Sequence, residues 1–171
     1  MAIAPDTKDW TWVVETRCDE CGTDPAGFAR EDVPRLLRET AARWVAFLRD
    51  GRATTVRPDD RTWAPLEYAV HVRDVVRLYD ERLRLMLETD NPLYPNWDQD
   101  ASAVADRYLE QDPAEVADDL EREAEVLARR FAAVTDWDRP GRRSDGARFT
   151  VDSFARYFLH DPLHHLHDVG A

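Results

Sequence analysis

The sequence YFLHDPLHHLHD spans residues 157–168 and carries four of the five histidines in the chain. Apolar side chains recur through this stretch, and just before it, at the spacing of one helix face. They are Phe154, Tyr157, Phe158, Leu163 and Leu166. We therefore predict an amphipathic helix near the end of the chain, with its apolar face buried against other helices.

Three of these histidines share one face of the predicted helix. Positions i, i+4 and i+7 align His160, His164 and His167, while His165 points elsewhere. Two imidazoles four residues apart can bind one metal ion, and His71 is the remaining histidine that could complete the site. A solvated His-rich tail would also account for these residues, as would histidines attracted by the dipole of a helix end.

Pro162 lies inside the predicted helix. A proline there removes one backbone hydrogen bond and clashes with the carbonyl four residues earlier, at a cost of about 3 kcal/mol. We expect a kink near Phe158, or a break after which the helix restarts with Asp161 as its cap. Either would change the aim of His160 relative to His164.

Further segments repeat the helical spacing of apolar residues. They cover residues 32–50, 65–88 and 112–135, with a shorter helix at 100–110. Prolines in the first turns and acidic residues at the caps support these starts. We see no strand-like alternation. The sequence therefore predicts an all-α protein, a four-helix bundle at residues 30–171 that follows an irregular arm at residues 1–29.

Composition limits the classes of function. The 171 residues carry a net charge of -12, and the pI is about 4.8. An acidic surface repels phosphate backbones, so we expect no nucleic-acid partner. We find no apolar run that could span a membrane and no secretory signal, and we expect a cytoplasmic protein.

The two cysteines form the motif Cys18-Asp-Glu-Cys21-Gly22. They are too few for a four-cysteine zinc site within one chain. The strand-to-helix junction that a thioredoxin-type motif needs is not evident. We expect a reduced pair in an N-terminal turn; a disulfide and a metal shared across a dimer are the alternatives.

His71 falls in the middle of the predicted helix at 65–88, with two carboxylates on the same face. Glu67 lies four residues before it and Asp74 three residues after it. They could orient the imidazole or join it on a metal ion. The alternative is a histidine at the edge of the core that bonds to one of these carboxylates.

Two motifs resemble those of a known family. WAPLEYAVHVRD at residues 63–74 and RYFLHDPLHH at residues 156–165 look like the ordered signatures of the DinB/YfiT-like superfamily. The resemblance implies an up-down-down-up bundle of four helices, often dimeric, with a divalent metal on three histidines. Carried over by position, these ligands are His71, His160 and His164. The chain departs from the pattern at Ala64 and Pro162.

The resemblance also implies a class of chemistry. Relatives include thiol-dependent transferases and isomerases that use mycothiol or bacillithiol, among them maleylpyruvate isomerase, while many members have no known activity. The implied cofactors are a divalent metal, for which we expect zinc or nickel, and a low-molecular-weight thiol. The implied partners are a small-molecule substrate and a second copy of the chain.

Our first hypothesis is an enzyme in which the metal activates a thiol that attacks a small electrophile. Asp161 or Asp168 could orient the ligands, Trp97 and Asp98 could line the pocket mouth, and Arg156 could bind a substrate carboxylate. Trp97 and Asp98 could instead be plain surface-loop residues, and Arg156 could form an ordinary salt bridge.

The second hypothesis is a non-catalytic binding protein, whose metal takes a fourth ligand such as His167 or Glu67. The third has no metal, and the histidines form a hydrogen-bonded core network.

Overall fold

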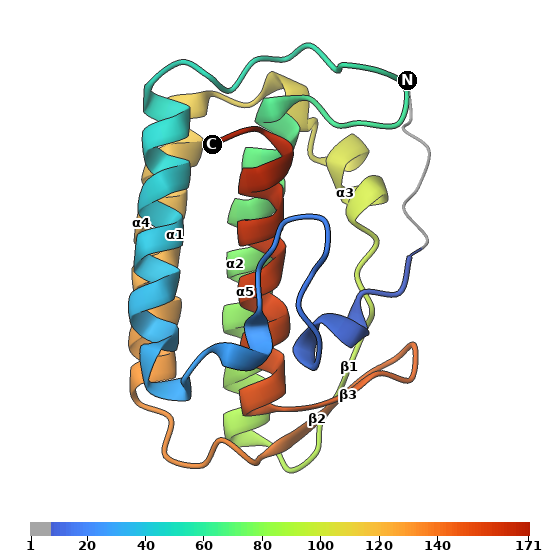
Figure 1. Ribbon diagram of the computed structural model, residues 1–171, viewed down its shortest axis with the longest axis vertical. Coiled ribbons are helices and arrows are strands. Elements are labelled where there is room, and N and C mark those ends of the chain that lie inside the picture. Colours follow the sequence, from blue (N-terminus) through green and yellow to red (C-terminus); the bar gives the residue numbers. More distant parts are fainter. Residues whose placement is uncertain (1–7) are drawn as a thin grey trace.

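Four long helices form the body of the protein (Figure 1). This computed structural model describes residues 8–171, so residues 1–7 of the predicted arm lie outside it. The long helices are α1 (Val33–Arg49), α2 (Pro65–Glu88), α4 (Pro113–Ala132) and α5 (Val151–Asp168). Followed by colour in Figure 1, α1 and α5 run upward, and α2 and α4 run downward. Helix α4 packs against α1 and α2, and α5 packs against the same two helices.

The long helices begin where the cap residues predict. The Asp112 carboxylate accepts hydrogen bonds from the backbone N–H groups of Ala114 and Glu115, at 2.7 and 3.3 Å. At the start of α2, Ala64 cannot cap with its side chain, but the Glu67 carboxylate accepts from the Ala64 N–H at 2.9 Å. Caps of this kind contribute about 1 kcal/mol each. The predominantly helical prediction is confirmed, with the expected extra helix α3 at Gln99–Ala105.

A small sheet lies at the lower end of the bundle in Figure 1, where the sequence predicted only loops. It contains β1 (Leu93–Tyr94), β2 (Pro140–Arg143) and β3 (Arg148–Thr150). β2 pairs parallel to β1 and antiparallel to β3. The prediction of no strands was wrong, because strands this short hold too few residues for an alternating pattern. Gly141 allows β2 to approach α2, since a Cβ there would lie 2.9 Å from the Met86 side chain.

Pro162 does not break α5, which runs without interruption from Val151 to Asp168. The predicted restart at Asp161 is therefore wrong. The indole N–H of the buried Trp44 on α1 donates to the Pro162 carbonyl at 2.9 Å. Packing of this helix face against α1 thus holds the backbone in place despite the missing proline N–H.

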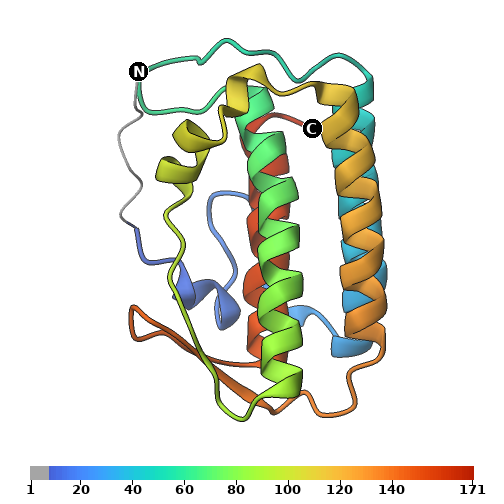
Figure 2. The ribbon, with the colours of Figure 1, turned by 180° about the vertical axis from the view of Figure 1, so that it is seen from behind.

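The N-terminal arm lies along α5, on the side away from α2 (Figures 1 and 2). Its 3₁₀ turns cover Thr11–Val14, Pro25–Gly27 and Arg30–Asp32. Val13 and Cys18 are fully buried. The Arg156 guanidinium donates to the Pro25 carbonyl at 2.8 Å and to the Ala26 carbonyl. Arg156 therefore fastens the arm to α5.

Within residues 8–171, no helix combines the length and the apolar character that crossing a membrane requires. The expected cytoplasmic location stays a prediction.

Candidate functional site

Helix α5 presents two pairs of metal-ligand side chains, each spaced four residues apart. One pair is His160 and His164, and the other, displaced by one residue, is Asp161 and His165. Because successive residues are rotated by about 100° around a helix, the two pairs face different neighbours. The first pair meets the N-terminal arm, and the second meets α2.

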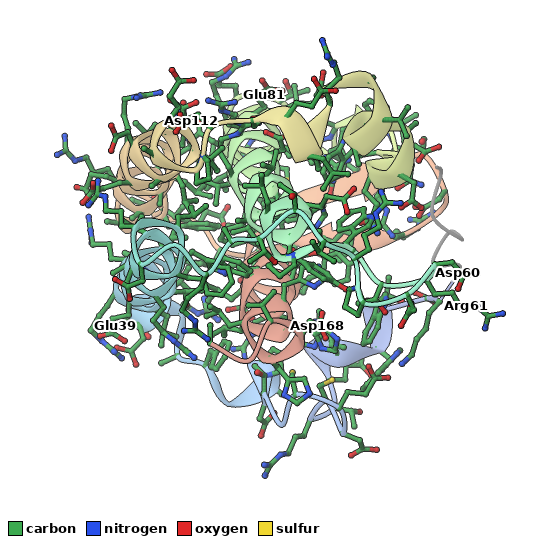
Figure 3. The ribbon with its side chains drawn as sticks, turned by 90° about the horizontal axis from the view of Figure 1, so that it is seen from above. Glu39, Asp60, Arg61, Glu81, Asp112 and Asp168 are labelled. Carbon is green, nitrogen blue, oxygen red and sulfur yellow. The ribbon has the colours of Figure 1, made fainter. Side chains whose placement is uncertain are left out.

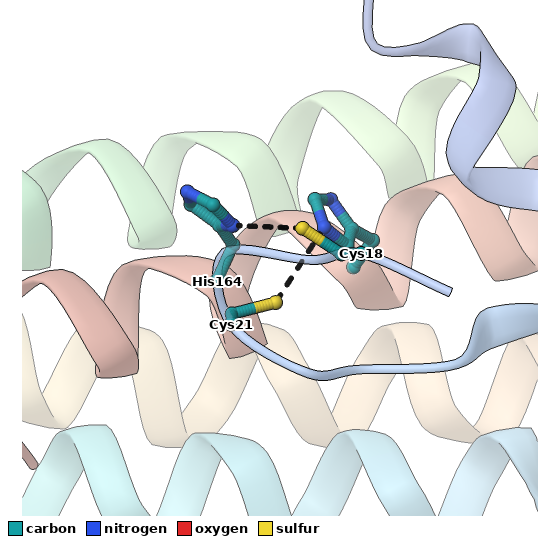
Figure 4. Close-up of side chains that lie close together, drawn as sticks. Cys18, Cys21 and His164 are labelled. Atoms are coloured by element: carbon teal, nitrogen blue, oxygen red, sulfur yellow. Dashed lines mark hydrogen bonds between the residues drawn. The ribbon is translucent and has the colours of Figure 1, made fainter. Parts of the chain in front are cut away.

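The first pair belongs to what we call the arm cluster, formed by Cys18, Cys21, His160 and His164. One ligand atom from each residue lies within 4.8 Å of all the others. The Cys18 Sγ is 3.7 Å from the His164 Nδ1, and the Cys21 Sγ is 3.7 Å from the His160 Nε2. Figure 4 shows how the turn that carries the cysteines lies beside α5 and directs both sulfur atoms at the imidazoles.

The second pair belongs to the cavity cluster, formed by His71 on α2 with Asp161 and His165 on α5. Their ligand atoms also lie within 4.8 Å of one another. The His71 Nε2 is 3.3 Å from the Asp161 Oδ1. A nitrogen and an oxygen that bind one tetrahedral ion lie about 3.3 Å apart, since each metal–ligand bond is about 2.0 Å.

Three buried polar atoms of the cavity cluster have the chemistry of metal ligands or of groups that orient them. Among the described residues, neither ring nitrogen of His71 has a hydrogen-bond partner, and neither has the Asp161 Oδ1. A buried polar group without a partner costs about 1–3 kcal/mol. These atoms fit a divalent cation, which would satisfy the His71 nitrogen and the Asp161 oxygen that face each other.

The structure thus divides the predicted ligands between two clusters. His160 and His164 lie in the arm cluster, and His71 lies in the cavity cluster. Within residues 8–171, the set His71, His160 and His164 does not form a group whose ligand atoms all converge. The sequence did not predict Cys18 and Cys21 as neighbours of the histidines, because no local sequence pattern indicates that the arm packs on α5. It also set His165 aside, although the spacing of Asp161 and His165 is the same as that of His160 and His164.

Burial changes the pKa of several candidate ligands. Burial lowers the pKa of His160 to about 4 and also lowers the pKa of His164, so both rings stay neutral near pH 7. Burial raises the pKa of the Cys21 thiol. Burial opposes ionisation of Asp161, but its charge interactions with His71 and His165 outweigh this effect and lower its pKa to about 2.

A cavity of about 1230 Å³ lies beside both clusters. Its walls come from the arm, α2, α5 and the segments that lead into α3 and the sheet, and His71, Asp161 and His165 all line it. Four large aromatic residues near the clusters also line it: Trp10, Trp63, Tyr68 and Trp97. The Trp97 ring stacks on the His71 ring, with centroids 5.3 Å apart and planes 9° apart. Pockets for small molecules commonly enclose about 300–1000 Å³, so this cavity has room for two reactants.

Two arginines add positive charge to the cavity wall. The Arg82 side chain is buried, its Nη2 donates to the Pro95 carbonyl at 2.7 Å, and its Nε has no hydrogen-bond partner among the described residues. The Arg82 guanidinium lies 4.8 Å from the centre of the Tyr94 ring. Burial lowers its pKa, yet arginine remains charged in proteins. Arg143 pairs with Asp145 at 2.8 Å. Sequence reasoning missed Arg82, because an arginine within a helix pattern normally indicates a solvated face.

The other residues that the sequence singled out lie in different surroundings, some outside the cavity and some at its wall. The Glu67 carboxylate caps α2 and pairs with Arg57, and Asp74 accepts from the Tyr108 hydroxyl at 2.7 Å. These partners replace the expected contacts with His71. Trp97 and Asp98 line the cavity. Arg156 pairs with Asp152 at 2.9 Å and is not among the residues that line the cavity.

The last two candidates, His167 and Asp168, lie near the end of α5 and differ in their contacts. His167 is exposed and belongs to neither cluster. The Asp168 carboxylate lies 2.8 Å from the His165 Nδ1 and can fix the orientation of that ring. Viewed from above in Figure 3, Asp168 lies beside α5, whereas Glu39, Glu81 and Asp112 lie at the outer edge of the bundle.

The fold and the two clusters define a helical bundle that gathers candidate metal ligands between its segments. The sequence profile of the DinB superfamily matches residues 52–169, more than half of the chain. The chain therefore belongs to the DinB superfamily. The match includes the cavity cluster but does not extend to Cys18 and Cys21.

A solved structure with a similar fold is YfiT from Bacillus subtilis, described as a probable metal-dependent hydrolase with an unusual four-helix bundle topology. The two chains are 18% identical, with a TM-score of 0.71, and the likeness covers 81% of this chain and 82% of YfiT. At this identity, the comparison shows a shared fold. None of the curated proteins matches the sequence.

Proposed function

We propose that this protein is a metal-dependent enzyme that adds a low-molecular-weight thiol to a small, carboxylate-bearing electrophile: as a transferase it leaves the thiol in the product, and as an isomerase it breaks the new carbon–sulfur bond again and releases the thiol. The observation that carries the proposal is the position of the cavity cluster. Buried polar atoms of His71 and Asp161 that have no hydrogen-bond partner within residues 8–171 stand at the wall of a cavity large enough for two reactants. We place the catalytic cation on His71, Asp161 and His165, in place of the expected set with His160 and His164.

The ligands in the cavity cluster suit a catalytic site. Two imidazoles and one carboxylate provide three protein donors, which leaves room for a reactant. When bound there, a divalent cation such as zinc or nickel lowers the pKa of a thiol or of water toward neutrality. Asp168 orients His165 through the contact at 2.8 Å, and Trp97 orients His71 through their parallel rings.

The arginines supply the binding site for the electrophile. Arg82 and Arg143 both line the cavity, and the Nε of Arg82, which has no hydrogen-bond partner within residues 8–171, is a donor for a carboxylate oxygen. A hydrogen bond to a charged group contributes about 1.5–3 kcal/mol. The aromatic walls would exclude water from the reactants. In this arrangement the thiol lies at the cavity cluster and the carboxylate of the electrophile lies at the arginines.

Hydrolysis is the second candidate, and the likeness to YfiT favours it. It would use the same three ligands, with water in place of the thiol. A small-molecule binding protein without turnover is the remaining alternative, and the homodimer stays a prediction.

The test is a transfer assay with protein purified without a histidine tag and loaded with zinc or nickel. A panel of low-molecular-weight thiols is offered with carboxylate-bearing electrophiles, and both thiol consumption and product are measured. We expect turnover that needs thiol and metal and is lost in His71→Ala but kept in His167→Ala. Turnover without thiol would favour hydrolysis. Turnover that is indifferent to His71→Ala and to metal removal would contradict the proposal.

A further inference from the structure

The arm cluster contains the donor set and the spacing of a second metal site. Zinc holds cysteine sulfur at about 2.3 Å and histidine nitrogen at about 2.0 Å, so tetrahedral ligands of the two types lie about 3.6 Å apart. The two Cys–His pairs in this cluster both measure 3.7 Å. All four donor atoms lie within 4.8 Å of one another. The four side chains therefore already surround one point.

The turn that carries the cysteines is shaped to aim both at α5. The Gly22 N–H donates to the Cys18 carbonyl, and the Cys18 N–H donates to the Thr23 carbonyl, each at 2.8 Å. Gly22 has a φ of +74°, a conformation that residues with a side chain rarely adopt. These bonds close a compact loop in which Cys18 and Cys21 face the same histidine pair (Figure 4).

The surroundings of His164 also fit a metal ligand. With its Nδ1 directed at Cys18, its Nε2 faces the carboxylates of Glu20 and Asp168, at 3.6 and 3.7 Å. Histidines that bind metal commonly direct their second nitrogen at a carboxylate. The Trp10 ring lies over the cluster, with its centroid 5.5 Å from that of His160 and 4.9 Å from that of His164.

The number of donors separates this site from the cavity cluster. Four protein ligands complete a tetrahedral site, which is typical of structural zinc, whereas catalytic sites keep a position open. Two thiolates and two imidazoles also favour zinc over magnesium or calcium. Segments of the arm, Trp10 among them, line the cavity.

We propose that Cys18, Cys21, His160 and His164 bind a structural zinc ion that fastens the N-terminal arm to α5 and so completes one wall of the cavity. This second ion is distinct from the one at the cavity cluster. In this proposal the two cysteines act as zinc ligands. They do not act as a redox pair and take no part in turnover.

Cobalt loading under reducing conditions tests the proposal, because cobalt bound to thiolate absorbs in the near ultraviolet. The wild type should bind two cobalt ions per chain and show this thiolate absorption. The double variant Cys18→Ser/Cys21→Ser should bind one ion and lose the absorption. The double variant His71→Ala/Asp161→Ala should also bind one ion but keep the absorption, and His167→Ala should match the wild type. The two sites are thus read separately, whatever the result of the transfer assay.

Wild-type protein that binds cobalt without thiolate absorption would overturn the proposal, as would a cysteine double variant that still binds two ions. If the cysteine double variant does not fold, the presence or absence of thiolate absorption in the cobalt-loaded wild type decides whether the proposal stands. Limited digestion with trypsin gives a second readout at the exposed Arg17, within the arm. Removal of zinc from the wild type, or the milder change Cys21→Ser, should make cleavage after Arg17 at least several-fold faster. An unchanged cleavage rate in the zinc-free wild type would contradict the fastening role.

Discussion

The arm cluster and the cavity cluster use neighbouring residues of one helix for different purposes. The arm cluster has four donors, enough to complete a tetrahedral site, and two of them are sulfur atoms from a segment with no long helix; His160 and His164 also line the cavity. The cavity cluster has three donors, all from helices α2 and α5, and it faces open space. A shift of one residue along α5 therefore changes the neighbouring segment, the number of donors and the expected role of a metal site.

The largest expected effect comes from His165→Ala. It removes a donor from the cavity cluster, so we expect the catalytic efficiency of thiol transfer to fall by more than about 100-fold, the upper end of losses from outer-shell changes at metal sites. Its melting temperature should stay close to that of the wild type, because the arm cluster remains intact. The paired measurement is kcat/KM with thermal unfolding. A variant with normal activity would remove His165 from the site.

Substitution of the preceding residue, His164→Ala, should lower the stability of the protein more than its activity. It breaks the arm cluster, so the variant should lose the share of the zinc-dependent stabilisation that the arm cluster supplies. That contribution is about 4 kcal/mol when free zinc is a thousand times its Kd. Denaturant unfolding at buffered zinc, compared with unfolding in chelator, measures it for both proteins. Zinc that stabilises His164→Ala as strongly as the wild type would contradict the assignment.

The substitution Arg82→Met separates the role of the metal site from that of the cavity wall that binds the carboxylate. Loss of a charged hydrogen bond of about 1.5–3 kcal/mol should raise KM for a carboxylate-bearing electrophile by about 10- to 100-fold. The methyl ester of the same electrophile is the matched control and should respond much less. Equal losses for acid and ester would mean that Arg82 shapes the cavity without binding the carboxylate.

Trp97→Leu should have the smallest effect. It removes the ring that stacks on His71, and aromatic pairs contribute about 0.5–1.5 kcal/mol. We expect metal affinity at the cavity cluster to weaken by about 2- to 10-fold, measured by competition with a coloured chelator. The thiolate absorption of the cobalt-loaded arm cluster should not change. A change there instead would show that the two clusters are coupled.

The sequence predicted the helices well because their ends carry local signals. Asp112 and Pro113 mark the start of α4, and Gly51 follows α1 with a φ of +72°. The strands were missed because their pairing joins residues 93–94 with 142–143, a contact that short-range patterns do not encode. The bundle class was thus accessible from the sequence, and the small sheet was not.

The candidate site could be predicted only in part, for a geometric reason. The sequence singled out His71 and the histidine-rich stretch of α5, and the structure places candidate metal ligands at both. Pairs with the same spacing of four residues recur in that stretch, among them His160 with His164 and Asp161 with His165. Only the rotation of α5 against α2 and the path of the arm decide which pair meets His71. Neither is readable from local sequence.

In our proposals, α5 holds two separate metal ions on two of its faces. The most direct measurement is a crystal structure of the zinc-loaded protein with anomalous scattering recorded at the zinc edge. We predict two peaks, one among Cys18, Cys21, His160 and His164 and one among His71, Asp161 and His165. A single peak bound jointly by His71, His160 and His164 would contradict the account.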